Sequence, residues 1–252
     1  MNALGHCAPA WTRRARPLLG TLVEVGVAAG CTHAEAVLAA AFAAIQQVQD
    51  CLSRFDAGSD IARFHALRVG ASLTVRGPTR TVLAAARELQ AASAGLFDIS
   101  LRTAPTGWHC DGERLRKLDA ATRLDLGGIG KGFAVDCAVQ ALIDHGCAGG
   151  WVNAGGDLRA FGSADVPVVL RDEQHGGVRA FATLTDGAFA TSWFGGNGNH
   201  GSHGGRSAAG PAHVSVAAPL CLWADALTKI VALSGDIRHP LLARYDARAW
   251  LH

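Results

Sequence analysis

Hydrophobic residues recur at helical spacing in the first half of the chain and at strand spacing in most of the second half. Apolar positions three and four residues apart predict helices over about 33–52, 79–94 and 130–145, with a short helix inside 54–65. Shorter apolar stretches, separated by Gly, Asp and Pro, predict strands at 21–28, around 152, and at 158–161, 166–170, 179–184, 188–192 and 214–217. A last helix is predicted over about 221–234, after Pro219.

This order of elements predicts an α+β or mixed α/β architecture with a strand-rich C-terminal half, and not a doubly wound parallel sheet. Local signals indicate some boundaries. Thr32 is expected to cap the first long helix, Ser59 the short helix, and Gly95 to end the helix over 79–94. A glycine-rich stretch at 195–210 predicts a long loop.

Composition narrows the class of protein. The 252 residues are 49% hydrophobic and 17% charged, which is typical of a globular protein with a substantial core. A net charge of +2 argues against a nucleic-acid-binding protein, because phosphate backbones require clustered Lys and Arg. The basic cluster within 13–16 is expected to lie in a flexible tail over residues 1–16. The seven cysteines include no C-x-x-C pair, and most lie in apolar surroundings, so they are interpreted as reduced, structural thiols and not as disulfides or zinc ligands.

No targeting segment is visible in the sequence. The N-terminal residues lack the continuous apolar stretch of a signal peptide, and no stretch reaches the length of a membrane-spanning helix. As written, the chain is therefore expected to be cytoplasmic. A start further upstream would allow a periplasmic or membrane-associated protein.

Residues 124–136 (LDLGGIGKGFAVD) place four glycines and Lys131 directly before a predicted helix. Glycines allow a ligand to approach the backbone closely, and the N-terminus of a helix favours an anion. The segment is not a P-loop, because Asp125 stands where that motif requires Gly and Gly132 where it requires Ser or Thr. These residues alone predict either another kind of phosphate-binding loop or a tight turn.

Further short motifs accompany this segment: LGT at 19–21, SRF at 53–55 followed by Ser59, FDIS at 97–100, VNAGGD at 152–157 and ADALT at 224–228. In this order and at these separations they resemble the ApbE family, the FAD:protein FMN transferases, from about residue 17 to about 235. The resemblance implies a T-fold-like mixed α/β domain, here spanning 17–252. It also implies FAD as substrate, Mg²⁺ as cofactor and an acceptor protein as partner.

The resemblance implies a set of contacts to the flavin nucleotide. Most of them are small, hydroxyl-bearing or acidic residues of the motifs, and the set comprises Gly20, Thr21, Ser59, Asp98, Asp125, Gly130, Lys131, Asn153, Gly155, Gly156, Asp157, Thr191 and Ser192. Phe55 matches an aromatic residue that relatives place at the flavin ring. Without the resemblance, Asn153 and Asp157 fit turns in which their side chains bond to nearby backbone.

The resemblance also implies that Asp225, a hydroxyl one turn later and the carbonyl of Gly128 hold a magnesium ion. In relatives a Thr lies four residues after the Asp, but this chain has Lys229 there. Thr228 shares that helix face and is expected to replace it, with Lys229 pointing away from the site. The alternative is that the Lys229 ammonium takes the place of the ion. Without the resemblance, Asp225 fits a carboxylate that complements a helix N-terminus.

The resemblance implies magnesium-dependent transfer of FMN from FAD to a Thr or Ser hydroxyl of the acceptor, with release of AMP. Lys131 is expected to neutralise charge on the diphosphate, and His203 is the candidate general base, with His200 as a competitor. The Asp and Pro that follow this His in relatives are absent here. The alternatives are hydrolysis of FAD to FMN and AMP, FAD binding without transferase activity, and generic nucleotide binding.

Overall fold

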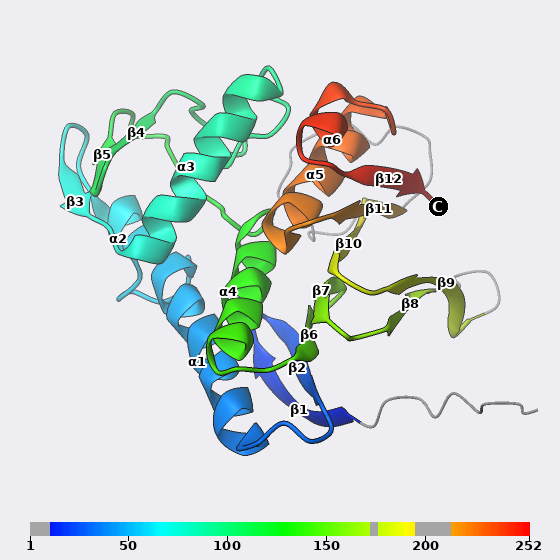
Figure 1. Ribbon diagram of the computed structural model, residues 1–252. Coiled ribbons are helices and arrows are strands. Elements are labelled where there is room, and N and C mark those ends of the chain that lie inside the picture. The colour runs from blue at the N-terminus through cyan, green and yellow to red at the C-terminus, as the bar shows by residue number, and fades with distance from the viewer. Residues whose placement is uncertain (1–10, 172–175, 195–212) are drawn as a thin grey trace, which may run out of the picture.

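One antiparallel sheet of seven strands forms the centre of the computed structural model, which describes residues 11–171, 176–194 and 213–252. The strand order is β1-β2-β6-β7-β10-β11-β12 (Figure 1). The bounds are β1 Trp11–Leu18, β2 Thr21–Ala28, β6 Gly149–Ala154, β7 Asp157–Gly162, β10 Gly187–Trp193, β11 His213–Ala218 and β12 Arg248–Leu251. All six pairs of neighbouring strands are antiparallel.

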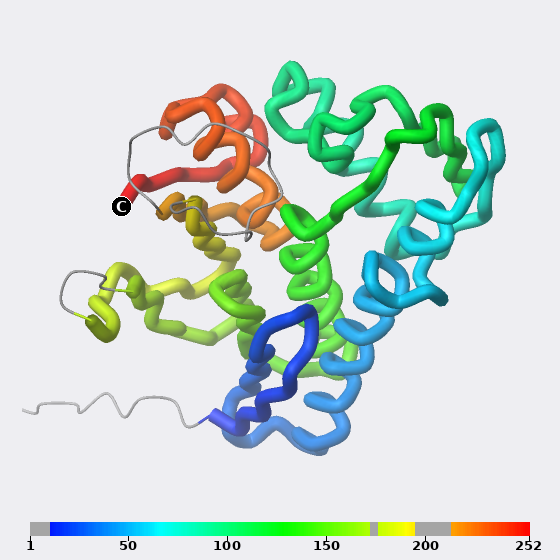
Figure 2. The backbone as a smooth tube through the Cα atoms, turned by 180° about the vertical axis from the view of Figure 1, so that it is seen from behind, coloured from blue at the N-terminus to red at the C-terminus, as the bar shows by residue number. Residues whose placement is uncertain are grey.

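Three long helices cover one face of this sheet. They are α1 (Ala34–Leu52), α4 (Gly130–Asp144) and α5 (Cys221–Ser234), with α1 and α4 side by side and α5 against α4 (Figures 1 and 2). The strand residues that face the helices are apolar, and they share one large buried core with the helix residues. Removal of this apolar surface from water is the main contribution to the stability of the layer.

A hairpin of β8 (Val166–Arg171) and β9 (Val178–Leu184) lies against the opposite face of the sheet. A second, smaller core forms there, because successive residues of a strand point to opposite faces. In β10, for example, Phe189 belongs to the hairpin core and Ala190 to the helix core. Neighbouring residues of one strand can therefore serve separate sides of the molecule.

A small lobe packs beyond α1 and consists of α2 (Asp60–Ala66), α3 (Gly77–Ala92) and a three-stranded sheet in the order β3-β5-β4. These strands are β3 Ser72–Thr74, β4 Trp108–Asp111 and β5 Arg114–Lys117. The helix α6 (Pro240–Arg244) precedes the last strand of the large sheet. The α+β architecture expected from the sequence is confirmed.

Residues 11–16, predicted as part of a flexible tail, instead form most of β1. This edge strand carries exposed arginines and Pro17, so it lacks the apolar alternation from which strands are predicted. A two-residue turn joins β1 to β2, with positive φ at both Leu19 (56°) and Gly20 (73°). Such a type I′ turn suits the twist of a hairpin.

The predicted cap of the first long helix is also wrong. The N-cap of α1 is His33 in a left-handed conformation without a side-chain cap, and not Thr32. The prediction for Ser59 is confirmed, since its hydroxyl accepts the Ala62 N–H at 2.9 Å. The small strands β3, β4, β5 and β12 and the helix α6 were not predicted, because each is too short to show a period.

The six cysteines in the described part of the chain are free thiols, as expected, but only Cys51 and Cys221 are buried, and the other four are partly exposed. In that part, no helix is long and apolar enough to cross a bilayer.

The first turns of α4 and α5 meet in very close contact. A Cβ on Gly132 would lie 2.2 Å from the Cys221 carbonyl oxygen, so only glycine fits there. Asp136 of α4 caps α5, because its carboxylate accepts the N–H groups of Cys221 (2.9 Å) and Leu222 (2.8 Å). Arg159 of β7 donates to the same carboxylate at 2.8 Å.

His65, at the end of α2, fixes the entry to the glycine-rich segment. Its Nε2 accepts the backbone N–H of Leu124 at 2.9 Å, so the imidazole is neutral with its proton on Nδ1. Burial lowers the pKa of His65, and the nearby charges of Arg123 and Lys117 lower it further.

The contact at Gly132 predicts a large effect of one methyl group. Gly132→Ala should lower the free energy of unfolding by about 3 kcal/mol, because a backbone carbonyl cannot move aside as a side chain can. Gly130→Ala is the control in the same helix: its Cβ would meet the flexible end of Leu52 at 3.3 Å and should cost less than about 1 kcal/mol. Urea unfolding measures both, and equal stabilities would contradict the close contact.

The lowered pKa of His65 predicts loss of stability in mild acid. Well above pH about 6.5, the usual pKa of histidine, the imidazole is neutral in both the folded and the unfolded state and contributes no pH dependence. On acidification the unfolded chain binds the proton first, so the free energy of unfolding should fall between pH 7 and pH 5. His65→Gln should reduce this slope, whereas His109→Gln, on the exposed side of β4, should keep it. A wild-type slope retained in His65→Gln would assign the effect to other groups.

Candidate functional site

Four charged side chains gather where α4 and α5 meet the ends of β7 and β10. Lys131 of α4 donates to Asp157 of β7, and Lys229 of α5 donates to Asp225 Oδ1 on its own helix. The side chains of Asp157 and Asp225 are 1% and 0% exposed, whereas that of Lys131 remains 31% exposed. The cluster is thus buried and electrically balanced, and Lys131 is its most accessible member.

The pKa shifts follow from this arrangement. Burial alone would lower the pKa of Lys131, but the carboxylates of Asp225 and Asp157 outweigh it and raise the pKa. Burial would raise the pKa of Asp225, but Lys131, Lys229 and the Gly132 N–H keep it below its usual value. Burial and the Asp225 charge raise the pKa of Asp157 to about 6. Lys131 and Asp225 are therefore both ionised at neutral pH.

The expected anion site at the N-terminus of α4 already contains an anion from the protein. Gly132 N–H donates to Asp225 Oδ2 at 3.1 Å. Other N–H groups of the glycine-rich segment are also satisfied internally: Gly127 donates to Asp125 Oδ1 at 2.8 Å, and Gly130 to the Leu126 carbonyl at 2.7 Å. In this conformation, Lys131 is the group of the segment best placed to meet a ligand phosphate.

The predicted magnesium ligands do not fit an ion as they lie. Lys229 and Gly132 occupy both oxygens of Asp225, and the Thr228 hydroxyl donates to the Asp225 carbonyl at 2.6 Å. Two unit charges about 4 Å apart interact with an energy of about 4 kcal/mol at an effective dielectric constant of about 20. A divalent ion at that distance from the Lys229 ammonium would be repelled by about twice that energy. No cluster of three or more metal-ligating side chains occurs in the described ranges.

The expectation that Lys229 points away from the site is therefore wrong. The alternative, in which its ammonium takes the place of the ion beside Asp225, fits the structure. Its Nζ lies toward Asp225 and also donates to Ser192 Oγ at 2.9 Å. Ser192 Oγ is 2.9 Å from Thr228 Oγ1, so both hydroxyls belong to this cluster. Gly128 is buried in the turn before α4.

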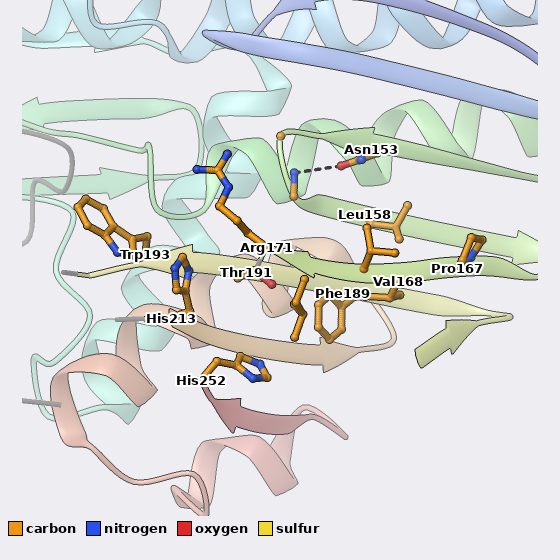
Figure 3. A pocket seen from close by; sticks show the side chains of 14 residues that line it. Asn153, Leu158, Pro167, Val168, Arg171, Phe189, Thr191, Trp193, His213 and His252 are labelled. Carbon is orange, nitrogen blue, oxygen red and sulfur yellow. Dashed lines mark hydrogen bonds between the residues drawn. The ribbon is translucent and has the colours of Figure 1, made fainter. Parts of the chain in front are cut away.

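A cavity of about 520 Å³ opens on the other face of the sheet (Figure 3). Trp193 and His213 lie at one end of it and Pro167 and Val168 at the other, with Phe189 between them. Aromatic and apolar walls of this kind suit a planar ring. The turn between β6 and β7 also lines the cavity, and Asp157 of the charged cluster directly follows this turn.

A chain of hydrogen bonds ends at this cavity. Arg179 lies 3.3 Å from His252 Nδ1, His252 Nε2 lies 3.2 Å from Ser215 Oγ, and Ser215 Oγ lies 2.8 Å from Thr191 Oγ1. Arginine only donates, so Nδ1 accepts and Nε2 carries the proton. Burial, Arg179 and His213 lower the pKa of His252, which agrees with a neutral ring. Either hydroxyl can donate in the Ser215–Thr191 bond, so the chain connects Arg179 to the wall of the cavity at Thr191.

The β6–β7 turn confirms the local interpretation of Asn153, whose Oδ1 accepts the Gly156 N–H at 3.0 Å. Gly155 and Gly156 both have positive φ, of 62° and 102°. A Cβ on Gly155 would lie 2.4 Å from Thr21 Oγ1, so Thr21 lies directly against this turn. The structure thus brings Thr21 and the turn next to the cavity and the charged cluster.

Other predicted flavin contacts are engaged in local structure. The Ser59 hydroxyl also donates to the Ser53 carbonyl, in addition to capping α2. Asp98 is buried and accepts the N–H groups of Ser100 (2.8 Å) and Arg102 (3.0 Å). These side chains shape the loops and have little capacity left for a ligand.

Phe55 lies on an accessible part of the surface, whereas the side chain of Asp125 is only 14% exposed. Phe55 is 85% exposed, with the Arg54 guanidinium over its ring at 4.7 Å. Arg54 also pairs with Asp125 at 2.9 Å. Gly20 lies in the β1–β2 turn. His203 and its competitor His200 lie outside the described residues, so the structure does not place the candidate base.

Sequence reasoning missed Ser215 and His252, because residues on one face of a sheet are brought together only by strand pairing. Ser215 lies opposite Thr191 in the β10–β11 register, and opposite Trp250 in the β11–β12 register. Alternation along β11 and β12 was the only available signal. It could not indicate which strands are neighbours.

Comparison with models of known protein families identifies one matching family. The model of the ApbE family matches residues 19–249. No curated protein sequence matches the chain.

Solved structures show the same fold. The flavinyl transferase ApbE of Pseudomonas stutzeri is 21% identical, with 99% of this chain and 92% of that chain covered and a TM-score of 0.81. The flavin transferase ApbE of Vibrio cholerae is 18% identical, with coverages of 96% and 93% and a TM-score of 0.84. An ApbE protein of Thermotoga maritima is 21% identical, with coverages of 96% and 94% and a TM-score of 0.81. At these identities the structures establish the fold alone.

Proposed function

The chain belongs to the ApbE family, and on that premise we propose that it transfers the FMN half of FAD to a Thr or Ser hydroxyl of an acceptor protein. The family match over residues 19–249 is the observation that carries the proposal. The charged cluster and the cavity support it, because they offer a cation for a diphosphate and an aromatic wall for a planar ring. The β6–β7 turn lies between these two parts.

In the proposed reaction the acceptor hydroxyl oxygen attacks the FMN phosphorus of FAD. A new P–O bond forms, the diphosphate P–O bond to AMP breaks, and the hydroxyl proton passes to a base or to water. AMP is the leaving group. His203 stays the proposed base, although it lies outside the described residues.

Catalysis of phosphoryl-type transfer depends mainly on positioning and on neutralising charge. Lys131 is suited to this role because Asp157 holds its ammonium in place and its side chain is still partly exposed. The raised pKa of Lys131 keeps the ammonium charged throughout the neutral range. Magnesium dependence, which the resemblance implies, has no part in this proposal because Lys229 occupies the expected ligand.

A second candidate function is FAD binding without transfer. The position of Lys229 favours it, since a fixed ammonium cannot bridge two reacting oxygens or exchange waters as a metal ion does. Hydrolysis of FAD to FMN and AMP would use the same site, with water as the nucleophile. The three functions differ in their products.

The proposal predicts AMP release coupled to covalent flavin. The protein is incubated with FAD and a panel of peptides, each with one Thr or Ser, and products are quantified by chromatography and mass spectrometry. Transfer should give AMP and FMN-peptide in equal amounts. AMP with free FMN would instead indicate hydrolysis, and bound FAD without AMP would indicate a binding protein.

The role of Lys131 is tested by FAD affinity, measured by quenching of flavin fluorescence. Lys131→Ala should weaken FAD binding by roughly tenfold or more, because a charge-assisted contact to phosphate is lost. Arg68→Ala, an exposed change in the small lobe, is the control and should bind FAD like the wild type. Unchanged FAD affinity in Lys131→Ala would contradict the assignment of the diphosphate to this cluster.

A further inference from the structure

Lys229 makes more polar contacts within the protein than a surface lysine would. Its ammonium donates to Asp225 Oδ1, to the Asp225 carbonyl at 3.1 Å and to Ser192 Oγ at 2.9 Å. Three acceptors satisfy all three donors of an ammonium group. The side chain is only 9% exposed, so Lys229 serves the interior of the site and leaves contact with a ligand to Lys131.

Lysine is rare in this chain, which makes the lysine at position 229 more informative. The chain has only three lysines, at positions 117, 131 and 229, against twenty arginines. Two of those three lysines lie in the charged cluster, each paired with a buried aspartate. A lysine presents a compact point charge, whereas the planar guanidinium of arginine is larger and has five donors. A compact cation is the group that can replace a small metal ion beside a carboxylate.

We propose that Lys229 is a built-in cation, so that the protein binds the diphosphate of a flavin dinucleotide without a divalent metal ion. The proposal rests on the proposed function for the identity of the ligand. The ammonium holds Asp225, Asp225 holds the first turn of α4 through Gly132, and that turn carries Lys131. Lys229 is thus a positioning residue. Its positive charge neutralises the Asp225 carboxylate, which a bound metal ion would otherwise do.

Charge balance explains why one substitution should reverse this behaviour. With both lysines present, the two buried aspartates are neutralised within the protein. Replacement of Lys229 by threonine would leave the Asp225 Oδ1 free and place a hydroxyl one turn after it on the same helix face. A carboxylate and a hydroxyl oxygen are ligands that magnesium accepts together with substrate phosphates.

The first experiment measures binding of Mn²⁺ alone by electron paramagnetic resonance, without flavin. The wild type should bind no Mn²⁺ in this cluster, whereas Lys229→Thr should bind about one ion per chain. Asp225→Asn added to Lys229→Thr should remove that ion. Stoichiometric binding by the wild type that Asp225→Asn abolishes would overturn the proposal, and so would absence of binding in a folded Lys229→Thr protein.

The second experiment measures FAD affinity by quenching of flavin fluorescence, in EDTA and in MgCl₂. The wild type should give the same dissociation constant in both, within about twofold, and a loss of roughly tenfold in EDTA would overturn the proposal. Lys229→Thr should bind roughly tenfold more weakly in EDTA and recover in magnesium. Lys229→Met, which removes the charge and adds no oxygen ligand, should stay weak in both, and its recovery in magnesium would contradict the role assigned to Lys229.

Circular dichroism verifies that each variant is folded, and the wild-type measurements do not depend on any variant. A wild type that binds no FAD in either buffer would contradict the proposed function. The Mn²⁺ experiment would still decide whether Lys229 excludes a metal ion. The two proposals therefore fail separately.

Discussion

The contact between the first turns of α4 and α5 is the constraint on which the rest of the site depends. Each helix supplies a carboxylate to the N-terminal region of the other: Asp136 of α4 caps α5, and Asp225 of α5 accepts an N–H of α4. The exchange requires the backbones to approach as closely as Gly132 allows. Because the protein's own carboxylates meet the positive ends of both helix dipoles there, a ligand phosphate has to be met mainly by side-chain cations.

This reciprocal capping determines the electrostatics around it. Asp225 is ionised and completely buried, and an unpaired charge in that position would cost several kcal/mol. Lys229 compensates this charge from within the same helix, while Lys131 and Asp157 form the neighbouring pair. The pairing leaves Lys131 as the accessible cation.

The sequence predicts the long elements of this fold well, because α1, α3 and α4 each bury one face and so repeat at a helical period. The helix α5 and the strand β10 are buried on more than one side and appear in the sequence as apolar stretches between turn residues. The sequence predicts β1 poorly, since an edge strand with arginines and a proline has no buried face to mark it. For the site, the spacing of Asp225 and Lys229 shows only that they share a helix face. Whether the ammonium turns toward the carboxylate depends on Ser192 and Gly132, which reach it from other elements. The chain from Arg179 to Thr191 depends likewise on strand order, which no local pattern contains.

The alternation of β10 has one further consequence for the size of ligand that the protein can hold. Thr191 faces the cavity and Ser192 faces the charged cluster, although they are adjacent in the chain. Gly156 and Asp157 are divided between the two sides in the same way. A molecule that contacts both sides has to bend around the ends of β7 and β10. A ligand that contacts both Thr191 and Ser192 must therefore be long and flexible enough to reach from one face of the sheet to the other.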